Sequence, residues 1–430
     1  MKKRSLVALV TALLLLASTT AFAGGEQEEG EPEAEGFNIW HVQTDEGSLR
    51  DVFDDVAADF EEDHGVEVEV VPIQNDPYKD RILVAMSAGD PPAIFQTWGG
   101  GPLHEFIDGD NVHPIDPIHD ELLDRYLPGS FDPVTFDDGV YGAAYSGLTG
   151  VYFWYRTDIF EEHGVEPPET WSELLDAVDT FNEAGITPIS LGNQHGWTGS
   201  FYYMYLVDRL GGEDLLQEAL FGGERDFEDE AFVRAGEMIR ELVEADAFPD
   251  GYNGMDEETA RILMYSDQAA MYLMGQWHYP IHEGESPETA EHLDFFPFPE
   301  VEEGNGDPSN LVGSPGQDYL AISTNISDVE LAYTFFTDYL MNDQWAQFLA
   351  DNGQIPPVQN ARDYLDDSTL EDILVTFEEA NHVQVYYDQY MDPELGQEHI
   401  ELMQALFGGD MSPEEVARRH QETWEDIQEE

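Results

Sequence analysis

Three tryptophans occupy places where a polar or glycine-bearing segment meets a predicted strand. Trp98 closes the strand predicted over 92–98 and precedes three glycines, where a backbone can approach a ligand closely. Trp277 ends a Gly-Gln-Trp sequence after another strand, and Trp197 lies in a loop. Flat aromatic faces in a largely apolar cleft suit the C–H faces of a sugar ring. For Trp197, packing within its own loop is an equally good interpretation. Four other tryptophans, at mid-strand or helical positions, are predicted to be core: Trp154, Trp171, Trp345 and Trp424.

Polar side chains near these segments could bind the hydroxyls of such a ring. A buried hydroxyl left unpaired costs about 1–3 kcal/mol, so in such a site the polar set would decide which hydroxyl-bearing ring fits. Asp45 and Glu46 follow the first predicted strand, although Asp45 is equally well interpreted as a helix N-cap. Because the chain holds 92 acidic residues, any one carboxylate is more often solvated surface. The other candidate ligand-binding residues are Asn193, Gln317, Asp318, Asp388 and Tyr145.

Rival chemistries have weaker support. His278 and His282 have the spacing of a helical metal site, but Pro280 between them argues against a helix. The segment 108–111 has calcium-binding residue types without the glycine and terminal glutamate of an EF-hand loop. The sequence contains no P-loop, dinucleotide-binding glycine pattern or nucleophile elbow. We therefore expect no metal, no cofactor and no catalytic residue.

The elements that would position these residues alternate between strand and helix. Apolar residues at helical spacing predict a helix over 49–64, and period-two alternation predicts a strand over 66–71. Together with strands at 37–42 and 92–98 and a helix at 78–88, this order indicates an α/β sheet with crossover helices. Ligands of such sheets usually bind beyond the carboxyl ends of the strands. The pattern resumes with strands predicted at 150–155, 186–191 and 269–274, a helix that Thr170 caps, and strand-like segments at 294–298 and 318–323.

The N-terminal segment has the features of an export signal. Lys2, Lys3 and Arg4 precede an apolar run over 6–17, and a small-x-small sequence ends at Ala23. These features predict a signal peptide over 1–23, cleaved near Ala23, followed by an acidic flexible tether over 24–36. The sequence has no cysteine, so disulfides and a lipid-anchoring cysteine are excluded. We expect a periplasmic or secreted protein whose remaining residues, about 400, form two or three domains.

The net charge narrows the classes of partner. The chain has 92 acidic and 16 basic residues, which gives a formal net charge of −76. Concentrated salt would screen this self-repulsion over about 3 Å at 1 M, so we infer a halophilic source. Nucleic acids and anionic membrane surfaces are disfavoured as partners, and an uncharged ligand fits this field better than an anionic one.

Six short motifs occur in order along the chain. They are SAGDPPAIF at 87–95, YG at 141–142 with YRTDIF at 155–160, PPETW at 167–171, AM with GQW at 270–277, LAIS with AYTFF at 320–336, and GQIPP at 353–357. In this order they resemble the extracellular solute-binding proteins of carbohydrate ABC transporters, often called family 1. Arg156 stands where that family usually has asparagine. The resemblance also puts Trp277 at the family's sugar-stacking position.

The resemblance implies a two-lobed α/β fold of the periplasmic-binding-protein type (type II-like), with hinge crossovers and discontinuous lobes. Lobe one would comprise 37–147 and 298–343, and lobe two 148–297 and 344–430. It implies a monomeric, non-enzymatic substrate-binding protein that closes on a small neutral sugar or oligosaccharide and delivers it to the membrane permease of an ABC importer. Two alternatives stay open: a secreted glycoside hydrolase with paired cleft carboxylates, and a binding protein that serves a chemoreceptor.

Overall fold

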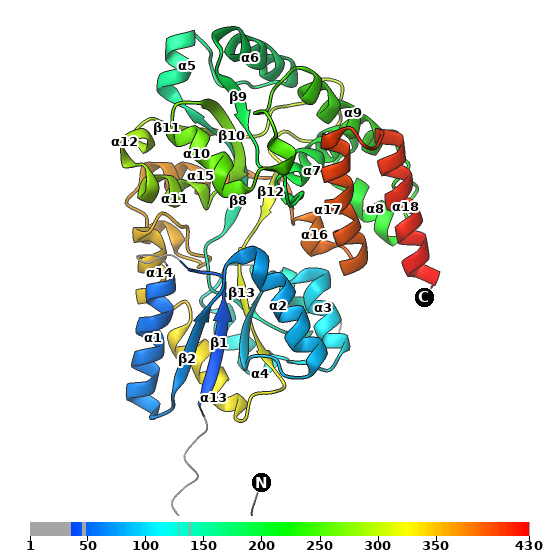
Figure 1. The fold of residues 1–430 in the computed structure, drawn as a ribbon. Coiled ribbons are helices and arrows are strands. Elements are labelled where there is room, and N and C mark those ends of the chain that lie inside the picture. The colour runs from blue at the N-terminus through cyan, green and yellow to red at the C-terminus, as the bar shows by residue number, and fades with distance from the viewer. Residues whose placement is uncertain (1–35, 45–48, 128, 137–138, 430) are drawn as a thin grey trace, which may run out of the picture. The chain divides into compact units, whose positions relative to one another are not determined.

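The computed structural model describes residues 36–44, 49–127, 129–136 and 139–429, and residues 35–430 group as one compact unit. Two mixed sheets form the framework of this unit, with helices packed around each (Figure 1). The predicted α/β fold class is therefore confirmed. We call the part built on the first sheet lobe one and the part built on the second sheet lobe two. The predicted signal peptide, the tether up to residue 35, and the candidates Asp45 and Glu46 lie outside the described residues.

The first sheet has the strand order β2-β1-β3-β13-β4, and β7 pairs with β13. β1 is parallel to β2 and β3, whereas β13 is antiparallel to β3, with Tyr319 opposite Thr97. The helix predicted over 49–64 is confirmed as α1, which buries Val52, Phe53 and Phe60 against lobe one's core. The strands are β1 (Phe37–His41), β2 (Val68–Pro72), β3 (Ile94–Thr97), β4 (Val112–His113), β7 (Ala143–Ala144) and β13 (Tyr319–Ser323).

The second sheet has the order β14-β12-β8-β10-β9, and β11 pairs with β8. Its central strand β8 is buried along its whole length and is antiparallel to β10, β11 and β12. A strand buried on both faces loses the period-two alternation that marks a half-exposed strand. The strands are β8 (Thr149–Arg156), β9 (Thr187–Ser190), β10 (Ala269–Gly275), β11 (Leu293–Phe296), β12 (Leu311–Ser314) and β14 (Val383–Gln384). A separate two-stranded sheet pairs β5 (Thr135–Phe136) with β6 (Gly139–Val140).

The helices begin and end largely where caps and glycines direct. The predicted cap at Thr170 is confirmed, because its side chain accepts a hydrogen bond from the Glu173 backbone and the two residues form a capping box. The helices of the N-terminal third are α1 (Leu49–His64), α2 (Asn75–Ala88), α3 (Gly100–Asp108) and α4 (Asp116–Leu123). The middle third contains α5 (Thr157–His163), α6 (Trp171–Ala184), α7 (Trp197–Gly211), α8 (Leu215–Phe221), α9 (Glu230–Glu244), α10 (Glu257–Tyr265), α11 (His278–Glu285) and α12 (Pro287–Ala290).

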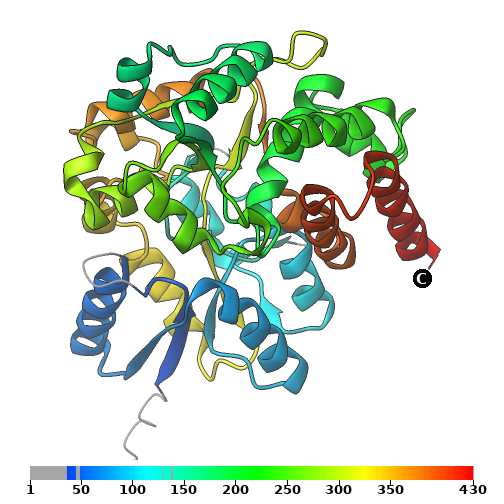
Figure 2. The same cartoon turned by 45° about the horizontal axis from the view of Figure 1, so that its top comes forward.

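The C-terminal helices contact both lobes. α17 packs on α7 and α18 packs on α9 in lobe two, while α16 and α17 also contact α3 of lobe one. Figure 2 shows α17 and α18 lying together beside the helices of lobe two. The C-terminal third contains α13 (Val329–Thr334), α14 (Asp343–Asp351), α15 (Ser368–Glu379), α16 (Tyr387–Tyr390), α17 (Pro393–Gly408) and α18 (Pro413–Glu429).

Two short crossovers connect the sheets. One joins β7 to β8 through residues 145–148, and the other joins β12 to β13 through residues 315–318. The predicted lobe limits differ from the strand pairing at one place, because β12 lies inside the segment 298–343 assigned to lobe one yet pairs with β8. Trp345, assigned to lobe two, packs against Phe53 of lobe one and donates to the Tyr145 carbonyl. We therefore propose that lobe one resumes after residue 315 and includes α14; the other limits remain predictions.

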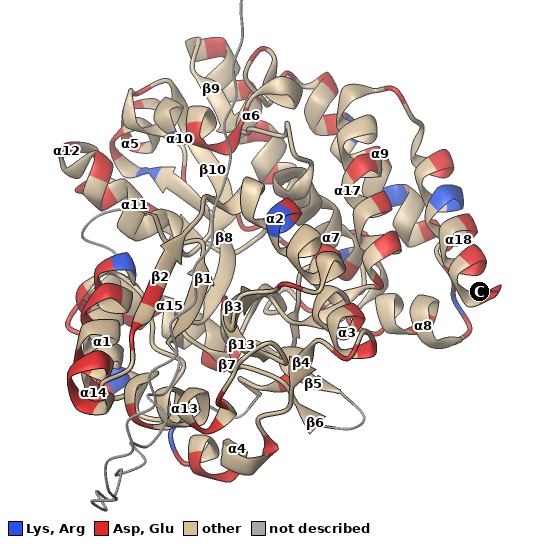
Figure 3. Cartoon of the chain, turned by 60° about the horizontal axis from the view of Figure 1, so that its bottom comes forward, with Lys and Arg blue, Asp and Glu red and all other residues tan. Residues whose placement is uncertain are grey.

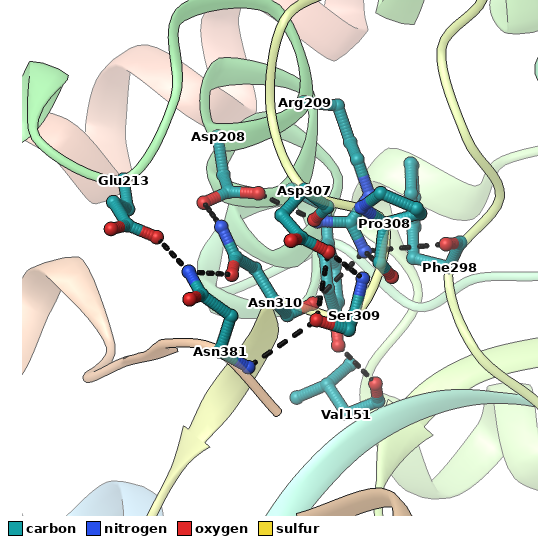
Figure 4. A network of polar contacts seen from close by, with 11 residues as sticks. Val151, Asp208, Arg209, Glu213, Phe298, Asp307, Pro308, Ser309, Asn310 and Asn381 are labelled. Carbon is teal, nitrogen blue, oxygen red and sulfur yellow. Dashed lines mark hydrogen bonds and ion pairs between the residues drawn. The ribbon is translucent and has the colours of Figure 1, made fainter. Parts of the chain in front are cut away.

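An arginine at the end of α7 holds the segment that leads into β12. The fully buried Arg209 guanidinium donates to the Asp208 carboxylate at 2.6 Å and to the carbonyl oxygens of Phe298, Asp307, Pro308 and Asn310 (Figure 4). Asp208 also accepts a hydrogen bond from the Asn310 amide at 2.9 Å. Buried charge is tolerated when it is paired and hydrogen-bonded in this way. The cluster thus ties the α7 helix, which begins at Trp197, to the segment that leads into β12.

Acidic side chains are spread over the helices of both lobes rather than gathered in one segment (Figure 3). Basic residues are few, and α2 carries two of them, Lys79 and Arg81. Several arginines are in pairs or triads with carboxylates, for example Arg261 with Glu257 and Glu285. The folded surface therefore keeps a large excess of negative charge, and the inferred salt requirement stays a prediction.

Candidate ligand-binding site

A cavity of about 790 Å³ lies where the two crossovers meet both lobes. Lobe one lines it with Gln43, and the crossovers contribute Ser146 and Asp318. Lobe two lines it with Gln276 and Trp277, from the end of β10 and the start of α11. This volume falls in the range of pockets that hold small ligands, roughly 300–1,000 Å³. Hollows of about 930 Å³ beside α3 and α17, and about 550 Å³ beside β1, contain none of the predicted site residues that the structure describes.

A carboxylate network forms the lobe-one wall of this cavity. Asp318 is buried, and its oxygens accept hydrogen bonds from Gln96 Nε2 at 3.0 Å and Ser146 Oγ at 3.0 Å. Gln43 Nε2 lies 3.4 Å from the same carboxylate. Burial raises the pKa of Asp318 from 3.8 to about 7, while hydrogen bonds from Ser146 and Trp98 act in the opposite direction. The site therefore contains a carboxyl group that gains or loses its proton near neutral pH.

The second crossover also connects this wall to lobe two. Thr149 Oγ1 at the start of β8 donates to Gln317 Oε1 at 2.7 Å. The Tyr386 hydroxyl lies 2.9 Å from Thr149 Oγ1 and 3.3 Å from Gln317 Oε1. Gln317 and Asp318 both line the cavity, and their role in binding a ligand stays a prediction. Tyr386 thus joins the polar part of the site to its aromatic part.

Lobe two contributes a cluster of aromatic rings. Trp277 lies 6.5 Å from Trp197 and 6.3 Å from both Phe201 and Tyr386, measured between ring centroids. Trp277 and Trp197 are each half-buried, so part of each indole remains accessible. Trp277 lies between β10 and α11, and Trp197 begins α7, so the packing of these elements brings together two residues distant in sequence. The structure brings these two predicted stacking residues together, and Trp277 lines the cavity.

Trp98 has different surroundings. Its half-buried ring has the edge of Tyr78 at 5.9 Å and the Lys79 ammonium 5.3 Å from its centroid. The indole also lowers the pKa of the Asp318 carboxyl, although Trp98 is not among the cavity-lining residues. The predicted arrangement in which Trp98 and Trp277 face each other across a gap therefore stays a prediction.

The structure shows why glycine occupies the positions after Trp98, a reason that the sequence did not reveal. A Cβ atom at Gly100 would collide with the Gln389 carbonyl oxygen, and one at Gly101 would collide with the Met391 carbonyl oxygen. The start of α3 in lobe one therefore touches the backbone around α16 directly. A Cβ atom at Gly99 would likewise collide with the Pro133 carbonyl oxygen. The interpretation that these glycines admit a ligand is therefore wrong for all three, because other stretches of the chain occupy that space.

Three further candidates have defined partners. The Asp388 carboxylate lies 3.6 Å from Lys79 Nζ, in an ion pair between α16 and α2. The buried Asn193 accepts a hydrogen bond from the Gly199 backbone at 3.0 Å and donates to Asn253, so it fastens the start of α7 rather than lining the cavity. Tyr145 is fully buried and donates to Gln96 Oε1. These contacts indicate supporting positions behind the cavity wall for Asn193 and Tyr145.

The reason given against a metal site at the histidine pair is wrong in part. His278, Pro280 and His282 do lie on a helix, α11, because proline is tolerated in a first helical turn. Both nitrogens of the buried His278 are without a hydrogen-bond partner, and burial holds its pKa well below the usual value. Among the described residues, no group of three histidine, cysteine or acidic side chains could hold a metal ion. The pair is therefore packed as neutral rings.

Sequence reasoning missed several polar residues of the site. Gln43 and Gln276 directly follow predicted strands, a signal that could have found them. Ser146 lies on the first crossover, and Thr149 begins β8 directly after it. The passage of this segment between the lobes is not visible in a local pattern. Gln96 lies within a strand that is buried along its whole length, where position alone predicts core.

Comparison with known proteins gives a consistent family. Residues 46–352 match the family described as bacterial extracellular solute-binding protein. The chain is 26% identical over 281 residues to an uncharacterized ABC transporter extracellular-binding protein of Pyrococcus horikoshii, covering 63% of each chain. It is 25% identical over 285 residues to a probable sugar-binding periplasmic protein of Rhizobium meliloti, covering 64% of each. The alignments thus span a little less than two thirds of these curated relatives.

Two solved structures are similar over almost their entire length. One, described under xylan utilization by the thermophilic bacterium Caldanaerobius polysaccharolyticus, has a TM-score of 0.81 at 28% identity and covers 90% of this chain and 99% of its own. A chitin oligosaccharide binding protein has a TM-score of 0.83 at 19% identity, covering 92% and 99%. The second likeness shows the fold alone. No helix among the described residues has both the length and the apolar character needed to span a bilayer. With the family match extending over most of the chain, the protein belongs to the bacterial extracellular solute-binding proteins.

Proposed function

We propose that this solute-binding protein is the exported substrate-binding component of an ABC importer and takes a neutral sugar or oligosaccharide into the cavity between its lobes. The observation that carries the proposal is the composition of that cavity. A half-buried indole, Trp277, faces the same space as the hydroxyl, amide and carboxylate groups of Ser146, Gln317 and Asp318. Relatives that bear sugar-binding names support the same ligand class.

The two walls would hold different parts of a sugar. The Trp277 indole would stack on the C–H face of a ring, while Asp318 and Gln317 would accept or donate hydrogen bonds at its hydroxyls. Because the walls come from different lobes, a ligand that contacts both would stabilise the closed arrangement over an open one. The closed form would then dock on the membrane permease of the importer.

The lining charges support an uncharged ligand. Four carboxylates border the cavity, at Asp318, Glu283, Glu285 and Asp351, and none of its described lining residues is a lysine or arginine. An anionic sugar would meet like charge there without a cationic partner. We further propose that a signal peptide directs export of the protein and that no lipid-anchoring cysteine holds it to the membrane. We also propose that it is monomeric and works in concentrated salt.

A calorimetric and thermal-shift survey tests the proposal. Neutral mono- and oligosaccharides are compared with glucuronate and sugar phosphates, in concentrated salt. A neutral carbohydrate at about 100 times its dissociation constant is expected to add about 2.7 kcal/mol to the unfolding free energy. If no carbohydrate shifts the transition, the ligand class is wrong. Release of reducing ends from an oligosaccharide would instead point to a glycoside hydrolase.

A further inference from the structure

Gln96 lies behind the lobe-one wall of the cavity and joins three segments of the chain. It lies on β3, between β1 and β13, and only 1% of its surface is exposed. The oxygen of its side-chain amide, Oε1, accepts hydrogen bonds from the Val42 backbone N–H at 2.9 Å and from the Tyr145 hydroxyl. Its amide nitrogen donates to Asp318 Oδ1 at 3.0 Å. A buried amide with this many partners has a fixed orientation.

The direction of each hydrogen bond follows from one backbone group. The Val42 N–H can only donate, so the oxygen of the Gln96 amide must face it. The amide nitrogen then faces Asp318, and Asp318 Oδ1 must accept. The Tyr145 hydroxyl gives its hydrogen to Gln96, so its oxygen is left to accept from Gln43 Nε2 at 3.5 Å.

Asp318 Oδ2 is the oxygen that remains for the cavity. It accepts from Ser146 Oγ at 3.0 Å and lies 3.4 Å from Gln43 Nε2, and all three residues line the cavity. A carboxylate oxygen has lone pairs for a further donor, such as a ligand hydroxyl. The titratable side chains that interact with this carboxyl are Tyr78, Tyr145, Tyr319 and Tyr386. Glu283, Glu285 and Asp351 border the same cavity.

We propose that Gln96 is a positioning residue that holds Asp318 as a hydrogen-bond acceptor and so makes the lobe-one wall select a ligand hydroxyl that donates at this point. The proposal rests on the proposed function, because the ligand must be one that carries hydroxyls. Gln96 does not contact the ligand and acts through Asp318 and Gln43. Gln43 and Asp318 both line the cavity and together present the donor and the acceptor that select the ligand hydroxyl.

Gln96→Glu tests the orientation with a side chain of nearly the same shape. Its carboxylate would still accept from Val42 and Tyr145, but would face Asp318 with no hydrogen to give. Two carboxylates about 3 Å apart cannot both be ionised and must share a proton. At low pH the shared proton is present and replaces the lost N–H donor between residues 96 and 318. At high pH the proton leaves, and repulsion between the two carboxylates displaces Asp318 from its position in the wall. Sugar affinity of the variant should therefore fall as pH rises.

The wild-type protein should show the opposite slope. The pKa of Asp318 is about 7, so the accepting form grows from about a tenth of the molecules near pH 6 to about nine tenths near pH 8. Apparent affinity follows the competent fraction, so binding should tighten by about tenfold over this interval. Calorimetric titrations in high salt, with the best neutral sugar found for the wild type, measure both slopes.

Two further variants keep the test decisive if Gln96→Glu folds poorly. The double change Gln96→Glu with Asp318→Asn exchanges amide and carboxylate, so one donor again meets one acceptor; it should fold and lose the inverted slope. Gln384→Glu is the matched control and should keep the wild-type slope, because Gln384 is a buried amide on β14 whose nitrogen donates to a backbone carbonyl.

Equal slopes in wild type and Gln96→Glu would overturn the inference while leaving carbohydrate binding intact. Failure of the wild type to bind any carbohydrate would overturn the proposed function itself.

Discussion

Replacing Asp318 by asparagine should change how the stability of the unliganded protein depends on pH. Burial raises the pKa of this carboxyl from 3.8 to about 7, and no lysine or arginine is among the described groups that shift it. The folded protein therefore holds this proton more tightly than the unfolded chain does. Stability from this group is fully present below about pH 4 and is lost as pH rises through about pH 7. By contrast, the buried Asp208 and the half-buried Glu257 each have an arginine partner.

The size of the effect follows from the difference between the two pKa values. Each tenfold change in proton affinity corresponds to about 1.4 kcal/mol, so ionising Asp318 costs the folded state about 4 kcal/mol. Asparagine has no such proton. The free energy of unfolding of the wild type should therefore fall relative to that of Asp318→Asn by about 4 kcal/mol between about pH 4 and pH 8. The asparagine's own hydrogen bonds add a constant offset and leave this slope unchanged.

Urea unfolding at a series of pH values, in fixed high salt, measures the difference between the two proteins. Subtracting one curve from the other removes the contribution of the chain's many other acidic groups, because both proteins share them. Asp176→Asn, an exposed aspartate on α6, is the control and should give a flat difference curve. A flat curve for Asp318→Asn as well would show that the carboxyl titrates normally and would refute the reasoning.

Three further predictions concern ligand binding, the α7 anchor and salt. Trp277→Ala should weaken sugar binding by about 2 kcal/mol, near thirtyfold in calorimetry, because it removes a stacking face; Trp424→Ala, which does not line this cavity, should leave affinity unchanged. Arg209→Ala should destabilise the fold by about 3–5 kcal/mol in urea unfolding because Asp208 loses its buried partner. The exposed Arg418→Ala should destabilise the fold far less, and equal costs for the two variants would contradict that account. Raising salt from about 0.1 M to 1 M should increase the urea midpoint, since screening relieves repulsion at a net charge of −76; an unchanged midpoint would argue against a halophilic setting.

Local patterns predicted the elements well where one face of an element is buried. The helix α1 has the predicted bounds because Val52, Phe53 and Phe60 repeat at helical spacing. The capping box at Thr170 fixed the start of α6 for the same local reason. Ordered motifs also predicted the family, which the comparisons confirm.

Pairing partners were harder to predict than the strands themselves. The segment of β12 was predicted to belong to lobe one, yet β12 pairs with β8 in the second sheet. The prediction failed because the residues of a short strand do not indicate which sheet the strand joins. Gly100 and Gly101 illustrate the same limit. Their need for small size comes from Gln389 and Met391, residues almost three hundred positions away.

The sequence by itself determined the α/β class, the family, the acidic charge and the aromatic residues available for a ligand, because periodicity, composition and motif order are properties of neighbouring residues. Only the tertiary structure decided which of those residues share a cavity. It brought Trp277 beside Trp197 and placed Gln43 and Gln96 around Asp318. The physical reason is that burial and hydrogen bonding arise between segments far apart in the chain, so the pKa and orientation of one carboxyl depend on partners no local pattern contains.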